Sequence, residues 1–259
     1  MRDNKIPTQH NTRKRRGNSR YFVFFVLVLL GFAALGFGAY HLLSSLDVLN
    51  VRKIEISGNS AVADSLLRSA LQPYMGQNLL KVDKAEVHAE VSGFARVKTV
   101  KVRRKLFSTL QIKLTERKPS LYAKSLEGDL FPVDEEGVVL ERYGKVYTEN
   151  LPLVNLLVNN AHLRSGRKLK NAALDKVLAT HRRIVEDAPE FVTNISEYYT
   201  IDNTVYIIDA RNGLRLIPSE KNLAKQLSRY EFVRDNGNVS QSSILDLRVD
   251  NQVVVKAGN

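Results

Sequence analysis

Residue types that could carry out enzyme chemistry are few in this sequence, and their spacing matches no catalytic or metal-binding motif. None of the five histidines has a neighbour at the spacing of a metal site; they are His10, His41, His88, His162 and His181. His181 falls on the apolar stripe of an expected helix, which favours a core or boundary histidine over a ligand. Cysteine is absent, so disulfides and thiolate chemistry are excluded.

The densest group of carboxylates is Asp134-Glu135-Glu136, which is a candidate cation site or catalytic carboxylate pair. Gly137 follows at once and two short strands flank the group, so a solvated hairpin turn is the favoured interpretation. The twelve-residue pattern of a calcium loop is absent, as are the glycine patterns of nucleotide-binding loops. No local motif supports a serine–lysine protease. We therefore expect no enzyme activity, metal, cofactor or small-molecule substrate.

The twenty residues from Tyr21 to Tyr40 carry no charge, and Leu42 and Leu43 extend the apolar run. Since a helix rises about 1.5 Å per residue, twenty residues span roughly 30 Å, the thickness of a hydrocarbon core. A cleaved signal peptide has a shorter apolar core of about 7–15 residues, and a buried soluble helix would show a polar face. The sequence therefore predicts a transmembrane helix over residues 21–43.

The charged residues on either side of this helix predict which of its ends lies in the cytoplasm. Residues 1–20 carry seven Lys and Arg against one Asp, which supplies half of the chain's net charge of +12, and the remaining +6 is spread over 239 residues. Because basic flanks stay in the cytoplasm, we expect a cytoplasmic tail over 1–20 and an external region beyond residue 43. The basic cluster of the tail is interpreted as a topology signal that also contacts anionic lipid; it consists of Arg13, Lys14, Arg15, Arg16 and Arg20.

The external region divides into two parts of different pattern. Residues 49–117 show alternation typical of strands at 51–57, 97–103 and 110–115, and helical spacing at 61–74. Asp83 and Glu86 resemble a capping box at the start of a second helix that Gly93 ends. The predicted order is strand, helix, helix, strand, strand.

Residues 118–259 predict a mostly antiparallel sheet with helices packed on it, so the external region as a whole is of the α+β class. The best helix covers 169–186, and a second is expected to begin at Ser219 as its N-cap. Asn212-Gly213 and Asp250-Asn251 are typical of hairpin turns. Strands are expected at 121–124, 130–133, 138–140, 205–210, 214–218, 244–249 and 252–256.

The order of these parts resembles the FtsQ/DivIB family of bacterial cell division proteins, and the 49–117 module resembles a POTRA domain. The resemblance covers residues 21–259. The family's tryptophan after the second POTRA strand is missing, since the chain has no tryptophan. The matching motifs are VRKIEISGN (51–59), VKTVKVRRKLFSTLQIKLTERKPSLYA (97–123), FPVDEEGVVL (131–140), LPLV (151–154), NGLRLIPSEKNLAKQL (212–227) and ILDLRV (244–249).

The resemblance implies a non-catalytic divisome scaffold in the bacterial cytoplasmic (inner) membrane at the septum. It would join FtsB and FtsL and link them to septal peptidoglycan synthesis. In the family the C-terminal sheet edge accepts a strand from FtsB, and 252–256 holds that position here. The interface residues expected by position are Ile244, Leu245, Leu247, Val253, Val254 and Val255.

Asp246 and Arg248 lie two residues apart in an expected strand, so their side chains share a face and can pair. We expect this pair to act as a strut that fixes the final hairpin. The alternative is a surface ion pair worth about 0–1 kcal/mol.

Three other functions stay open at this stage. A POTRA protein of an envelope assembly or secretion system usually carries several POTRA copies or a long barrel, and this sequence shows neither. An anchored periplasmic hydrolase would show a titrating group with a perturbed pKa. A DNA-binding protein is suggested by the pI of about 9.8, but charge confined to the tail argues against it.

Overall fold

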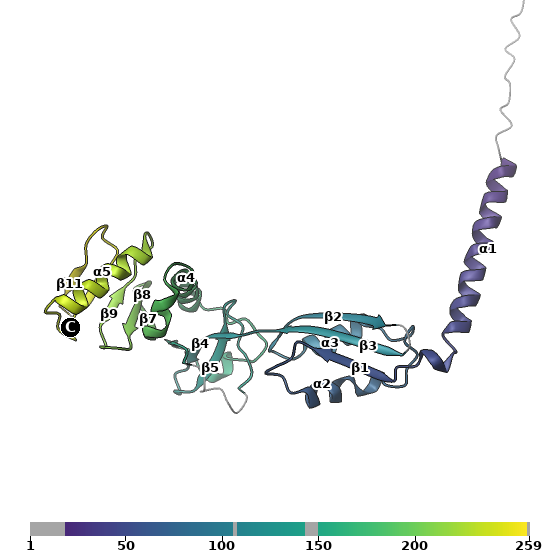
Figure 1. Cartoon of the computed structure of the whole chain (residues 1–259), viewed down its shortest axis with the longest axis horizontal. Coiled ribbons are helices and arrows are strands. Elements are labelled where there is room, and N and C mark those ends of the chain that lie inside the picture. The colour runs from purple at the N-terminus through teal and green to yellow at the C-terminus, as the bar shows by residue number, and fades with distance from the viewer. Residues whose placement is uncertain (1–18, 106–107, 143–149, 258–259) are drawn as a thin grey trace, which may run out of the picture.

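A computed structural model describes residues 19–105, 108–142 and 150–257, and Figure 1 shows their arrangement. Helix α1 (Ser19–Leu43) stands apart from the rest, and an 18-residue window within its stretch Tyr21–Leu43 reaches a mean hydropathy of 2.6 with none of that window buried. This helix is long and apolar enough to cross a membrane, as predicted. Arg20 lies in its first turn, whereas Arg13, Lys14, Arg15 and Arg16 lie outside the described residues, so the topology role of the cluster stays a prediction.

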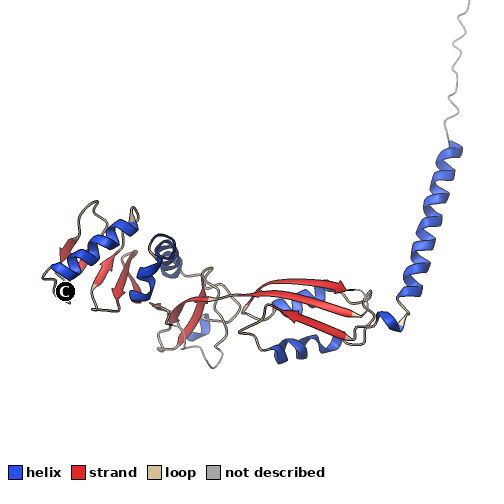
Figure 2. Cartoon of the chain, viewed as in Figure 1, coloured by secondary structure: helices blue, strands red, loops and turns tan. Residues whose placement is uncertain are grey.

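The first sheet has the predicted order of strand, helix, helix, strand, strand. Strand β3 is central in the order β1-β3-β2, and it is parallel to β1 and antiparallel to β2. The inner face of the sheet and the two helices share one hydrophobic cluster, and Figure 2 shows the helices beside the three strands. The elements are η1 (Asp47–Leu49), β1 (Lys53–Ser57), α2 (Asp64–Leu71), η2 (Gln72–Tyr74), α3 (Lys84–Ser92), β2 (Val97–Lys105) and β3 (Thr109–Glu116).

Both helices of this sheet follow the sequence prediction with small differences. Asp83 caps α3, but its side chain accepts the N–H of Ala85 rather than completing a capping box, and Gly93 ends the helix. Leu66 was expected on the apolar stripe of α2, yet it is exposed because the stripe turns through Leu67 and Leu71.

The second sheet has eight strands in the order β11-β10-β9-β8-β7-β6-β4-β5. Four of its seven strand pairs are antiparallel and three are parallel. Helices α4 and α5 complete a second hydrophobic cluster, which supports the proposed division of the external region at residue 117. The elements are β4 (Pro119–Lys124), β5 (Leu130–Asp134), β6 (Leu153–Asn155), η4 (Asn160–His162), α4 (Ala172–Asp187), η5 (Pro189–Asn194), β7 (Ile195–Ile201), β8 (Thr204–Asp209), β9 (Arg215–Ile217), α5 (Leu223–Asn236), β10 (Ile244–Asp246) and β11 (Val254–Lys256).

Strand β7 lies inside this sheet and was missing from the sequence prediction. It pairs antiparallel with β8 through a tight turn at Asp202 and Asn203, whose φ angles are 44° and 67°. Two successive residues with positive φ are typical of the type I′ hairpin turn, and Asn and Asp tolerate that conformation best after glycine. Asp202-Asn203 is therefore a hairpin signal that lacked the usual glycine.

Two other predicted features of the second sheet are wrong. Residues 138–140 return alongside β5 but form no continuous ladder, because Val139 makes a single antiparallel bridge to Val133 while Val138 bridges to Lys168 instead. Ser219 does not cap α5. Its hydroxyl accepts the N–H of Lys221 and closes a turn, and the helix begins after Asn222.

Glu116, at the end of β3, stabilises the turn that follows β1 by accepting hydrogen bonds from it. Its carboxylate accepts backbone N–H groups from Ser60, Ala61 and Val62 at 2.8–2.9 Å, and the Ser60 hydroxyl at 2.8 Å. Burial alone would raise the pKa of Glu116, but these donors lower it below the usual value.

Replacing Glu116 with Ala is expected to lower the free energy of unfolding by about 2 kcal/mol, because three backbone donors lose a charged acceptor. Chemical denaturation followed by circular dichroism measures this loss. Ser60→Ala removes one of the four contacts and serves as the control with a smaller effect. Equal stability of wild type and Glu116→Ala would show that water replaces the carboxylate without cost.

His181 is a core histidine, as the sequence favoured. It lies on the buried face of α4, and its Nδ1 is 2.9 Å from the hydroxyl of Tyr198. Burial lowers the pKa of His181 to about 4. The unfolded chain, with a histidine pKa of about 6.5, therefore takes up a proton between pH 6.5 and 4 that the folded protein does not.

The free energy of unfolding should fall by about 2 kcal/mol between pH 7 and pH 5, since stability is lost as the unfolded state gains that proton. Thermal unfolding at the two pH values measures the change. His181→Gln keeps a polar group near Tyr198 and does not titrate, so its stability should change less over this range. A parallel decline in both proteins would assign the pH dependence to other groups.

Candidate partner-binding edge and cleft

Strand β11 forms one edge of the second sheet, and β10 is its one neighbour in the strand order. A strand in this position presents a row of backbone donors and acceptors to which another chain can add a strand. Val255 is 49% exposed and Val254 is half-buried, while Val253 packs against the core from the loop before the strand. Ile244 of β10 is also half-buried, so these four side chains remain candidates for a contact.

Leu245 and Leu247 were expected at the same interface, and the structure places both in the core with no exposed surface. The reason is the period of the strand. Leu245 belongs to the hydrophobic cluster on one face of the sheet, whereas its neighbours Ile244 and Asp246 point to the opposite face. Neither leucine offers its side chain to a partner while the domain is folded, so neither belongs to the proposed interface.

Asp246 joins the last two strands. Its carboxylate receives two hydrogen bonds from the Arg248 guanidinium at 2.6 and 2.8 Å and one from Lys256 Nζ at 2.7 Å. The hydrogen bonds from Arg248, together with the one from Lys256, outweigh the opposing effect of burial and lower the pKa of Asp246 well below its usual value. The pairing with Arg248 follows from their spacing, but Lys256 became a partner only through the register of β10 and β11. These contacts support the proposed strut.

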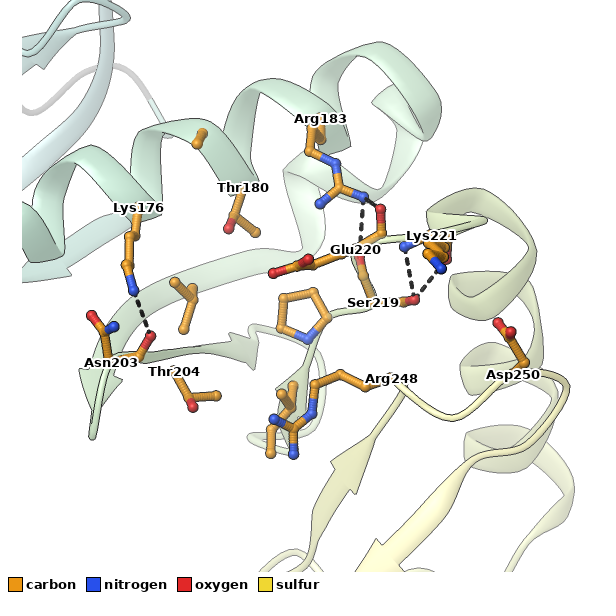
Figure 3. Close-up of a pocket in the computed structure, with 14 residues that line it drawn as sticks. Lys176, Thr180, Arg183, Asn203, Thr204, Ser219, Glu220, Lys221, Arg248 and Asp250 are labelled. Carbon is orange, nitrogen blue, oxygen red and sulfur yellow. Dashed lines mark hydrogen bonds between the residues drawn. The ribbon is translucent and has the colours of Figure 1, made fainter.

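A cleft of about 520 Å³ lies next to Arg248, between α4, the β8–β9 strands, the loop between β9 and α5 and the loop before β11 (Figure 3). Its wall carries four basic side chains against two acidic ones. Lys176 Nζ is 3.2 Å from the carbonyl of Asn203, and Arg183 donates to the carbonyls of Ser219 and Glu220. The charged residues of the wall are Lys176, Arg183, Lys221, Arg248, Glu220 and Asp250.

A buried polar cluster links β8 to α5. Asp209 is fully buried at the end of β8, and it accepts hydrogen bonds from the Tyr230 hydroxyl at 2.7 Å and from Arg211 at 2.7–3.2 Å. Burial raises the pKa of Asp209, but Arg211 and Tyr230 more than reverse that effect and lower it. Sequence reasoning missed this cluster, although an Asp two residues before an Arg at a hairpin is the same pattern as Asp246 and Arg248.

The acidic group at 134–136 joins the two sheets. It forms a turn as predicted, with Gly137 at φ 82°, but Asp134 is 2% exposed rather than solvated. Arg117, at the end of the first sheet, lies 2.6 Å from Asp134 and 2.7 Å from Glu136. Lys98 contacts Glu135 and Glu136 at 2.8 and 3.1 Å. The carboxylates therefore have protein cations as partners.

Within the described residues, no group of three or more His, Asp or Glu side chains lies close enough to hold a metal ion. The titrating groups whose pKa values depart most from normal are buried in the core or engaged in the ion pairs described above.

The fold defines a class of protein: a chain with one candidate membrane span, a POTRA domain and a C-terminal sheet domain. A family model described as POTRA domain, FtsQ-type, matches residues 49–117. The cell division protein DivIB of Clostridium botulinum strain Hall is 28% identical over 132 residues, half of each chain. The cell division protein FtsQ of Caulobacter vibrioides strain NA1000 is 34% identical over 40% of this chain and 34% of its own.

A longer match reaches the cell division protein DivIB of Solibacillus silvestris, which is 22% identical over 210 residues, 77% of this chain and 67% of the relative. The chain spans about half the length, or less, of the first curated relatives that it matches. Together these matches support the FtsQ/DivIB family of cell division proteins as the family that this chain resembles. The single apolar helix and these relatives indicate a bitopic membrane protein.

Proposed function

We propose that this protein is a non-catalytic scaffold of the bacterial divisome, which binds FtsB and FtsL through its external region and couples them to septal peptidoglycan synthesis. The observation that carries the proposal is the open edge at β11, in a chain whose relatives are cell division proteins. The basic tail and the near-neutral flank after α1 support an orientation with the N-terminus in the cytoplasm and the rest outside, at the septum.

Strand addition at β11 would give affinity through backbone hydrogen bonds, and side chains at alternate positions would give specificity. Val253, Val254, Val255 and Ile244 supply apolar contacts on the two sides of the edge. The basic cleft reaches the loop between β10 and β11 at Arg248 and Asp250. Its Lys176 and Arg183 would favour acidic side chains in a part of the partner that extends beyond the added strand. The Asp246–Lys256 pair would hold β11 ready for the added strand.

The test is binding of residues 45–259 to the external segments of FtsB and FtsL from the same organism. Both hydrophobic clusters lie inside this fragment, and none of α1 is buried, so the fragment retains its cores. We expect saturable binding by calorimetry, and weaker binding by Lys176→Glu with Arg183→Glu. A folded fragment that binds neither segment would contradict the proposal. Hydrolysis of peptidoglycan by the fragment would favour the anchored hydrolase instead.

A further inference from the structure

The external positive charge is not spread evenly, as the sequence analysis assumed, but lies in the POTRA domain. Residues 49–117 contain thirteen Lys and Arg against six Asp and Glu, whereas residues 118–259 contain nineteen of each. The excess of +7 therefore belongs to the part of the external region nearest to α1. The positive charge is therefore not confined to the tail, and that ground against a DNA-binding protein does not hold.

Much of this charge is on the outer face of the POTRA sheet, the face without helices. Lys101 of β2 lies directly opposite Lys113 of β3, and Arg103 lies opposite Gln111. Like charges placed opposite each other on neighbouring strands destabilise a sheet. Lys101, Arg103 and Lys113 are all exposed, and among the described residues no carboxylate is recorded within ion-pair distance of them.

These three cations border a hollow of about 220 Å³, which Thr99, Gln111 and Thr115 also line. The neighbouring carboxylate on this face, Glu55, is already paired with Lys53 and Lys105 at 2.9 and 2.8 Å. Lysines on an edge strand such as β2 can serve to prevent aggregation. That role does not explain Lys113, because β3 is the central strand.

The contacts between α1 and the POTRA domain indicate how close this basic face lies to the membrane. Asn78 of the POTRA domain donates hydrogen bonds to the carbonyls of Leu43 and Leu46 at the end of α1, at 3.3 and 3.2 Å. The backbone N–H of Arg52, just before β1, donates a hydrogen bond to the carbonyl of Ser108, just before β3, at 2.9 Å. The sheet end that carries Lys105 is therefore next to the end of the span. Lys101 is four residues back from Lys105, about 13 Å along the strand.

In the view of Figure 1, α1 rises from this end of the sheet and β2 is the strand on the same side as the helix. A helix that crosses the bilayer along its axis would set β2 near the headgroup layer. We propose that Lys101, Arg103 and Lys113 bind phosphate headgroups of anionic lipids in the membrane that α1 spans, and so hold the POTRA domain against the bilayer. This inference does not depend on the partner-binding edge of the second sheet.

The chain has no cysteine, so Gln111→Cys gives a single site for a fluorescent label at the edge of the hollow. The full-length labelled protein is placed in nanodiscs of phosphatidylcholine alone or with 30% phosphatidylglycerol, each with a quencher on the lipid headgroup. We expect stronger quenching in the anionic discs and loss of the difference in 1 M salt, where the Debye length is about 3 Å.

The test variant neutralises the three cations as Lys101→Gln, Arg103→Gln and Lys113→Gln. Its control carries the same change at exposed sites of the second sheet domain, Arg164→Gln, Lys170→Gln and Lys225→Gln. The test variant should lose the lipid dependence and the control should keep it, since each cation near an anionic surface contributes about fivefold to binding. Thermal unfolding confirms that both variants fold.

Equal quenching in the two lipid compositions would overturn the proposal, as would lipid dependence that survives in the test variant. Soluble poly-glutamate is added to phosphatidylcholine discs as a separate arm. If the label responds to poly-glutamate through the three cations and not to anionic lipid, the face binds an acidic polypeptide and the lipid assignment is wrong.

Discussion

Proline at one of two adjacent positions in β11 should strongly weaken partner binding without unfolding the domain. In an antiparallel edge strand, successive N–H groups point alternately to the neighbouring strand and to the open edge. Of Val254→Pro and Val255→Pro, one removes the N–H offered to an added strand and the other removes an N–H bonded to β10. Loss of a ladder hydrogen bond together with the obstruction by the ring should weaken binding of the FtsB segment by about 30- to 100-fold.

The pair of variants supplies its own control. The proline that faces the open edge should leave the unfolding temperature unchanged, and the proline that faces β10 should lower it. Val254→Thr and Val255→Thr retain both N–H groups and the β-branched shape, so they separate the backbone contribution from the side chain. Full binding by both proline variants in folded form would place the partner elsewhere on the domain.

Asp209→Ala should destabilise the C-terminal domain by about 3 kcal/mol, the largest single loss expected in this chain. The carboxylate is fully buried and accepts hydrogen bonds from Tyr230 and from the backbone and side chain of Arg211. Its removal leaves the buried Tyr230 hydroxyl without its acceptor, and it leaves the half-buried Arg211 guanidinium with Glu231 as its carboxylate partner. Urea denaturation of residues 45–259 measures the change in the free energy of unfolding.

Tyr230→Phe is the matched comparison, because it removes one donor and leaves the Asp209–Arg211 pair intact. We expect a cost of about 1 kcal/mol for this change. If Asp209→Ala costs no more than Tyr230→Phe, the buried carboxylate makes no net contribution to stability. Since a loss of stability can itself reduce binding, partner binding by Asp209→Ala is to be compared with wild type only after stability has been measured.

The sequence by itself determined the features that repeat along one element. A run of twenty uncharged residues was enough for α1, and the change between periods of two and 3.6 residues was enough for the order of the first sheet. His181 could be assigned to the core because the apolar stripe of its helix includes it. In each case the signal is local, since burial on one face leaves its period in the residues of that element alone.

Tertiary structure decided which charged residues meet. Asp134 reads as a solvated turn residue in the sequence, yet Arg117 from the other sheet covers it. Lys256 reaches Asp246, and Lys101 faces Lys113, because strand order and register bring together residues that are far apart in the chain. Periodicity reports how deeply a side chain is buried, but it contains no information on its partner across a sheet. The candidate edge strand could therefore be predicted from the sequence. The Asp246–Lys256 contact, the Arg117–Asp134 contact between the two sheets and the basic face of the POTRA sheet required the tertiary structure.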